Sequence, residues 1–336
     1  MQTTAHSARP AAAPRDRAAA RLWQASPPLT AVGLLMLLVA GASLVGVLVD
    51  PRIITGAPAW LKPFKFAIST AVYSLTLAWI FTFLSDRPRV RRVVGWITAV
   101  VFVLEVAIID LQAWRGTTSH FNGATALDRT LFIIMGAAIL TQTLVSVAVV
   151  VALWRQRFAD RALGWALRLG MALTVLGAMT GPLMTRPTPA QLDDLRAGGR
   201  LTIVGAHSVG GPDGGPGLPV TGWSREHGDV RVPHFVGLHA IQALALAALA
   251  LRRWRRPQAT RVRATMAVAA SHAALFGLLL WQALRGQSLA APDGAALAAL
   301  GTWAVATLAA LAVIARRGRG DREELIARAP TRRSTS

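Results

Sequence analysis

Four ionisable side chains, Glu105, Asp110, His120 and His239, stand in or beside long apolar stretches of the sequence. Carboxylates and imidazoles can donate and accept protons in catalysis, and together they can also bind divalent metal ions. Ionisable groups inside a membrane-spanning helix are costly and usually functional. We therefore predict that these four residues are catalytic. We also predict that they converge with His207 and His234 on one outer-side cavity, with Lys65 or Arg115 at its rim.

A metal-dependent version of this site would use His239, His234, His207 and Glu105 as ligands. His234 and His239 are five residues apart, about 140° around a helix, so they can share an ion only if the first helical turn is unwound. The chain has no cysteine, which excludes thiolate metal sites and iron–sulfur clusters. The cofactor is unknown from the sequence, and a divalent metal ion and a haem are the candidates.

Lysine usage points to a second group of functional side chains. Lys62 and Lys65 are the only lysines among 36 basic residues, and they share a helical stripe with Tyr73. The alternative is that they are anchors whose stems lie along apolar surface. If they are functional, they suit an anionic substrate. The residues predicted to bind that substrate are Lys62, Lys65, Tyr73, Arg115, Asn122, Asp213 and Gln242.

The composition requires that these residues be positioned by membrane helices. Hydrophobic residues make up 53% and charged residues 15% of the chain, whereas a soluble globule has about 25% charged residues. A bilayer core is spanned by about 20 apolar residues in a helix. We predict an all-α, polytopic transmembrane helix bundle of about eight spans, at residues 29–49, 66–84, 93–112, 129–153, 164–184, 235–251, 265–284 and 295–315.

Arginine clusters set the predicted orientation. They lie in the first 28 residues, in alternate links between spans and in the C-terminal tail, as expected for cytoplasmic segments. We predict a multi-pass protein of the bacterial cytoplasmic membrane with both termini in the cytoplasm. Residues 1–28 form a disordered basic tail, 29–315 the eight-span domain and 316–336 a second basic tail. The chain has a net charge of +20, and most of its arginines lie beside apolar segments. The lipid bilayer is therefore the expected partner and nucleic acid is not.

The longest link, residues 186–232, is predicted to be external. Its segment 210–219 is so rich in glycine and proline that it cannot form a helix or a central strand. It is either a flexible linker or an ordered lid over the bundle. Apolar Trp223, Val230 and Phe235 around this segment favour the lid.

Other polar and small residues fit ordinary structural roles. A seam of small residues on the fifth span predicts helix packing, and Thr125 with Asp128 predicts a helix cap. We also expect hydrogen bonds between helices from two polar side chains of the fourth span, and a buried, hydrogen-bonded histidine in the seventh. These residues are Gly170, Thr174, Gly177 and Gly181, then Gln142 and Ser146, and finally His272.

Three stretches carry a resemblance to known sequences. They are Trp60 to Phe66, Glu105 to Asp128 with its Ser119-His120-Phe121-Asn122 segment, and Gly210 to Gln242. With the pattern GGPDGGPGLP…GWS…GDxRxxHFxGLHA in the last of them, the chain resembles a family of uncharacterised multi-span bacterial membrane proteins. The resemblance covers about half of the chain and implies no catalytic assignment.

Three classes of function remain open at this point. The first is a metal- or haem-dependent membrane enzyme with an outward-facing His/carboxylate pocket, acting on a small or lipid-like anionic substrate. The second is a proton-coupled transporter of a small solute, for which polar groups at several depths are needed. The third is a sensor or assembly subunit with the Gly/Pro-rich loop as its docking lid. The sequence does not set the oligomeric state.

Overall fold

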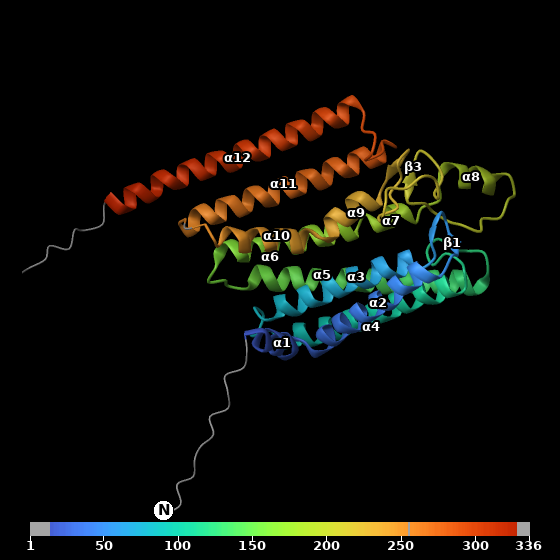
Figure 1. Ribbon diagram of the computed structural model, residues 1–336, viewed down its shortest axis with the longest axis horizontal. Helices are drawn as coiled ribbons and strands as arrows, with labels where there is room; N and C mark the ends of the chain where they lie inside the picture. Colours follow the sequence, from blue (N-terminus) through green and yellow to red (C-terminus); the bar gives the residue numbers. More distant parts are fainter. Residues whose placement is uncertain (1–13, 255, 328–336) are drawn as a thin grey trace, which may run out of the picture.

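The computed structural model describes residues 14–254 and 256–327, which form a bundle of helices lying roughly side by side (Figure 1). Its helices are α1 (Pro14–Ala25), α2 (Pro27–Val49), α3 (Leu61–Phe81), α4 (Pro88–Trp114), α5 (Ala126–Arg155), α6 (Arg161–Ala178), α7 (Gly181–Met184), α8 (Pro189–Arg196), α9 (Arg231–Leu238), α10 (Ala240–Leu251), α11 (Gln258–Leu284) and α12 (Gly294–Ala327). Four short strands form two antiparallel pairs: β1 (Ile53–Ile54) with β2 (Ala57–Pro58), and β3 (Ser208–Val209) with β4 (Gly228–Asp229).

The helices begin where the sequence supplies helix-starting residues. The Thr125 side chain accepts a hydrogen bond from the Asp128 N–H, so the predicted cap of α5 is confirmed. Asp160 caps α6 in the same way, through the N–H groups of Ala162 and Leu163. Proline in the first turn of α4 needs no N–H partner there. Local signals thus set the ends of the long apolar runs.

Seven of these helices are long and apolar enough to cross a membrane. The pair α9 and α10, bent by 46° at a short break, supplies an eighth. Each predicted span has a helical counterpart, and the helices extend a few residues beyond most of the predicted ends. The prediction of a predominantly helical bundle is therefore confirmed.

The bundle is built as a row of neighbouring helices. α2, α3 and α4 pack together, α5 connects α4 to α6, and α6 packs on α9, α10 and α11. The largest buried cluster contains Leu29, Phe81, Leu153, Leu167 and Ile241, which come from five of these helices. α12 packs on α11 and buries none of its apolar window, so several of its apolar side chains, among them Leu297, Val305 and Leu308, are exposed.

The two ends of the bundle differ in their connections. One end, which we call the loop end, carries β1, β3, α8 and the long link after α7, at the right of Figure 1. The opposite end carries α1 and the last described turns of α12. The described chain therefore starts and stops at the same end. Residues 1–13 and 328–336 of the two predicted tails lie outside the described residues.

The first tail differs from its prediction. Residues 14–25, expected to be disordered, form α1. Alanine, leucine and arginine are good helix formers, and Leu22 packs against the core. Arg91 of α4 donates hydrogen bonds to the carbonyls of Gln24 and Ala25 and so holds the end of α1. The composition of this segment does not reveal these contacts, because their partners lie in other helices.

The predicted small-residue seam is confirmed as the contact between α6 and the bent pair α9–α10. A Cβ added to Gly237 would lie 2.5 Å from the Cα of Gly177, so the two backbones are in direct contact. At the bend the Thr174 hydroxyl donates to the Leu238 carbonyl, and His272 Nε2 lies 3.0 Å from the Val236 carbonyl oxygen. His272 thus makes the predicted hydrogen bond, to a carbonyl group next to the break between α9 and α10, but it is only partly buried.

Candidate functional site

A buried carboxylate and a histidine meet at the loop end. Glu105 of α4 is 2% exposed, and its Oε1 lies 3.6 Å from Nε2 of His120 in the segment after α4. The Ser119 hydroxyl lies 3.1 Å from the other ring nitrogen, Nδ1. The second carboxylate oxygen of Glu105, Oε2, is buried and has no hydrogen-bond partner in the described part of the chain. The pair is close enough for proton exchange with small adjustments.

Aromatic rings surround His120. Phe66, Phe121 and Phe132 have ring centroids 5.7 to 6.2 Å from its imidazole. Phe121 has a positive φ of 63°, and Asn122 holds this turn by donating to Thr117 Oγ1 and the Thr118 carbonyl. Burial lowers the pKa of His120 well below its usual range, and the positive charge of Lys62 acts in the same direction. His120 is therefore neutral near pH 7.

Lys62, in the first turn of α3, supplies a cation beside this pair. Its ammonium group lies 5.8 Å from the centroid of the Phe66 ring and interacts electrostatically with Glu105, Arg231 and Asp213. Among the residues that the structure describes, no hydrogen-bond acceptor contacts this ammonium group. An ammonium group without acceptors in a partly buried position costs free energy, which a bound anion would recover.

A second histidine–carboxylate pair adjoins the first through Phe121. The rings of Phe121 and His207 are 4.8 Å apart, and His207 Nδ1 lies 2.8 Å from Asp213 Oδ2. Burial lowers the pKa of His207. Burial alone would raise the pKa of Asp213, but hydrogen bonds from His207 and from the backbone N–H groups of His207 and Ser208 bring it below its usual range. We call Lys62, Glu105, His120, His207 and Asp213 the loop-end cluster.

The Gly/Pro-rich segment is ordered and folds over the start of α3. Lys65 donates to the Thr221 carbonyl at 2.9 Å, and Arg231 donates to the Gly222 carbonyl at 2.7 Å. Arg231 also pairs with Asp229, at 2.6 Å. Gly56 lies against Gly214: a Cβ added to Gly56 would be 2.9 Å from the Gly214 carbonyl oxygen. These contacts hold the link against the start of α3, and its role as a lid stays a prediction.

Asp213 organises the lid, which gives a first prediction. Replacing Asp213 by alanine leaves the N–H groups of His207 and Ser208 without their acceptor, at a cost of about 1–3 kcal/mol for each unpaired group. We expect faster cleavage within residues 207–230 in limited proteolysis. Asp193→Ala is the control, because its pair with Arg196 is exposed and contributes little. Equal cleavage rates for the two variants would contradict this role.

The buried histidines predict a pH dependence of stability. Partial burial lowers the pKa values of His120 and His207 in the folded chain, whereas unfolded histidines bind a proton near pH 6.5. The unfolded state thus binds more protons below that pH, and the midpoint of thermal unfolding should fall as pH decreases from 7 to 5. In His120→Gln this slope should become smaller. An unchanged slope in this variant would show that His120 does not contribute.

The other predicted ligands are held in structural contacts. His234 Nδ1 lies 2.9 Å from the Gly177 carbonyl oxygen and 3.0 Å from the Thr180 hydroxyl, and the His239 ring packs on Phe235. The break between α9 and α10 is at His239, so the first turn of α9, which carries His234, stays helical. In residues 14–254 and 256–327, no three His, Asp or Glu side chains are placed to hold one metal ion. The side chains present therefore do not fit the predicted metal site.

Asp110 and Arg115 do not face the loop-end cluster. Asp110 is five residues after Glu105, so it projects about 140° away around α4 and faces α2 instead. Arg115 pairs with Asp128 at 2.6 Å and also donates to Gln112 Oε1. Asp110 therefore lines a different groove from the cavity in which it was predicted, because five residues of α4 turn it away from Glu105. Arg115, one of the two residues predicted at the rim, is held in an ion pair instead.

Tyr73 and Gln242 lie deeper in the bundle. The Tyr73 hydroxyl lies 3.1 Å from the Ser146 hydroxyl, which supplies the predicted hydrogen bond between helices, whereas Gln142 bonds Ser146 within α5. Gln242 makes a long contact of 3.5 Å with the Thr76 hydroxyl. Because these groups bond to protein, substrate contact at Tyr73 and Gln242 stays a prediction.

Sequence analysis missed three residues of the site. Phe66 and Phe121 pack beside His120. Arg231 donates to the Gly222 carbonyl and also acts electrostatically on Lys62. The spacing of Asp229 and Arg231, two residues apart, is a sequence signal that could have identified Arg231. The two phenylalanines carried no distinguishing signal, since phenylalanine is common in apolar helices.

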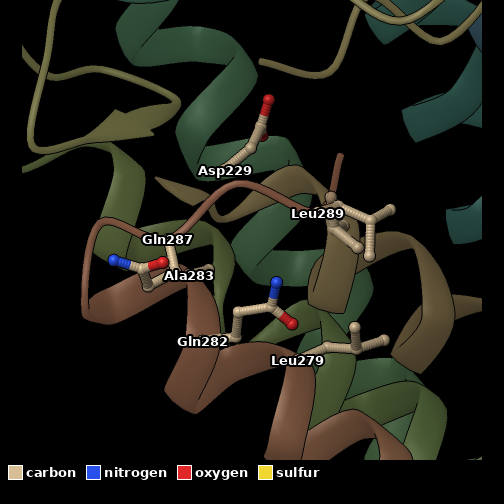
Figure 2. A pocket seen from close by; sticks show the side chains of 7 residues that line it. Asp229, Leu279, Gln282, Ala283, Gln287 and Leu289 are labelled. Carbon is tan, nitrogen blue, oxygen red and sulfur yellow. The ribbon is translucent and has the colours of Figure 1, made fainter. Parts of the chain in front are cut away.

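A small cavity marks the junction between the lid and α11 (Figure 2). Asp229 of β4 and Gln282 of α11 are among the side chains that line it, and its volume is about 10 Å³. Gln282 Nε2 donates to the Ser288 carbonyl at 2.8 Å, and its Oε1 has no partner among the described residues. A cavity of this size has room for about one water molecule, so it holds no substrate.

No family model, curated protein or solved structure matches the chain. The resemblance drawn from sequence motifs therefore stays a prediction. The fold and the geometry define a class by themselves: the described residues form a helical bundle with seven or eight helices long enough to cross a membrane, and a cluster of histidines, carboxylates and a lysine lies at its loop end.

Proposed function

We propose that the chain is an integral membrane enzyme whose outward-facing loop end binds a small or lipid-like anionic substrate. Lys62 binds the anion, and the Glu105–His120 pair moves a proton to or from it. The observation that carries this proposal is the position of two polar groups: Glu105 Oε2 is buried and has no hydrogen-bond partner among the described residues, and the partly buried Lys62 ammonium group interacts with it electrostatically. Unpaired buried groups are rare and are retained mainly at functional sites.

The orientation and the membrane belong to the same proposal. Arginine-rich links lie at the end opposite the lid, which supports a cytoplasmic location for that end and an external one for the lid. The apolar outer surfaces of α2 and α12 support contact with a bilayer. The proposal retains the anionic substrate predicted from the sequence. The Glu105–His120 pair supplies the proton transfer by itself, since no three His, Asp or Glu side chains of the described residues are placed to hold one metal ion.

The division of roles within the site has a direct test. Purified protein is screened by thermal unfolding against small carboxylates and phosphate monoesters, and compounds that stabilise it are then assayed for chemical conversion. Glu105→Gln should still be stabilised by such a compound but should not convert it, because the amide cannot exchange protons. Asp193→Ala is the control. Stabilisation of wild type by none of these anions, or conversion by Glu105→Gln at the wild-type rate, would refute the proposal.

A second candidate, proton-coupled transport, is favoured by polar groups deeper in the bundle. Below the loop-end cluster lie the Tyr73–Ser146 contact and the unpaired oxygens of Gln142 and Gln242, and α9–α10 is a broken span. Broken helices often border the substrate site of transporters. In proteoliposomes, solute-dependent proton flux that Tyr73→Phe reduces would favour transport over catalysis. Flux at the level of protein-free vesicles would oppose it.

A further inference from the structure

A groove at the loop end lies on the other face of α4 from the loop-end cluster. It has a volume of about 430 Å³ and opens on the surface of the bundle between α2 and α4. Val39, Ala42, Val45 and Val49 of α2 form its apolar side, and Trp114 of α4 lies at its loop end. Because Glu105 is directed to the opposite side of α4, the groove is separate from the proposed acid–base site.

The groove changes in polarity along its length. Its mouth at the loop end carries the Asp50–Arg52 pair, 2.6 Å apart, and the Trp60 indole, which donates to Asp50. From Val39 to Val49 the groove follows α2 for ten residues, about 15 Å. This is half of the roughly 30 Å hydrocarbon core of a bilayer. The groove therefore has the length and polarity of one lipid in one leaflet.

Two polar groups of the groove retain unused hydrogen-bonding capacity. The Oδ1 atom of Asp110 is buried, and no hydrogen-bond partner for it exists in the described chain. Arg52 uses Nε and Nη2 on Asp50 and Nη1 on the Trp114 carbonyl, which leaves two of its five N–H groups. Asp110 lies one helical turn before Trp114, so it is about 5 Å deeper than the carbonyl that Arg52 contacts.

We propose that this groove binds one phospholipid of the outer leaflet. Its phosphate accepts hydrogen bonds from the free N–H groups of Arg52, one ester carbonyl accepts a hydrogen bond from the protonated carboxyl group of Asp110, and one acyl chain lies along α2 between Val39 and Val49. In a phospholipid the ester groups lie next to the phosphate on the side of the acyl chains. Asp110 lies in the corresponding place, farther from the loop end than Arg52. Guanidinium groups suit phosphate because they offer paired donors in a plane.

The experiment measures lipid retained by the full-length protein. Protein in a mild detergent is mixed with phosphatidylglycerol or with diacylglycerol of the same chains, and bound lipid is counted by native mass spectrometry. Wild type should retain one phosphatidylglycerol and at least tenfold less diacylglycerol. Ala42→Trp, which fills the groove, should reduce retention of phosphatidylglycerol at least tenfold, whereas Leu140→Trp on the exposed face of α5 should retain it.

Two milder variants keep the test valid if Ala42→Trp does not fold. Arg52→Gln should remove most of the preference for phosphatidylglycerol over diacylglycerol, and Asp110→Leu should weaken retention of both lipids severalfold. Wild-type retention in both variants would overturn the proposal. So would equal retention of the two lipids by wild type, or a stable dimer that Ala42→Trp dissociates, because the groove would then bind a second copy. None of these outcomes depends on Lys62 or Glu105.

Discussion

Lys62→Met will lose binding of inorganic phosphate and small carboxylates while the chain remains at least as stable as wild type. Methionine keeps the length of the side chain and removes the ammonium group, whose charge-assisted hydrogen bonds to an anion contribute about 1.5–3 kcal/mol. The dissociation constant should therefore rise at least tenfold. Binding is measured by isothermal titration calorimetry in detergent, and stability by the midpoint of thermal unfolding.

The stability measurement separates a binding role from a structural one. Lys62 has no hydrogen-bond acceptor in the described chain, so its removal relieves an uncompensated cost of burial. Lys65→Met is the matched control, because Lys65 donates to the Thr221 carbonyl and should lose stability together with lid order. A drop in the unfolding midpoint of Lys62→Met, with anion affinity unchanged, would contradict a binding role.

Gly177→Ala is expected to cause a large loss of stability although it adds a single methyl group. Its new Cβ would overlap the backbone of Gly237 and Leu238, which cannot rotate away as a side chain could. The helices α6 and α9 would have to separate, at a cost of about 1–3 kcal/mol or more. The measurement is the midpoint of thermal unfolding in detergent.

The control for this change is Gly136→Ala on α5. A Cβ at Gly136 meets nothing within 4 Å, so the same chemical change should be neutral or slightly stabilising through helix propensity. A second readout distinguishes the two variants. Separation of α6 from α9 in Gly177→Ala should also expose His234 and Thr180, which contact each other between these helices. Equal midpoints for the two variants would show that the seam tolerates separation.

The candidate site could be predicted only in part. The ionisable residues in apolar stretches were identified because lipid and protein interiors both penalise charge, so their presence needs a reason. Glu105, His120, Lys62, His207 and Asp213 do lie near one another at the loop end. Asp110 does not, although its sequence neighbourhood is as apolar as that of Glu105. The direction of a side chain around a helix depends on its exact position in the sequence, whereas the composition of the surrounding stretch is the same for both residues.

By itself, the sequence determined the helical bundle, the approximate ends of its eight candidate spans and the packing role of the small residues of α6. These follow from local properties: the length of apolar runs, capping residues and the absence of side chains at glycine. Only the tertiary structure decided which polar groups remain unpaired, because each hydrogen bond joins segments that are distant along the chain. Thus Asn122 and Arg115 proved to have partners within the protein, whereas Asp110 Oδ1 has none in the described part of the chain.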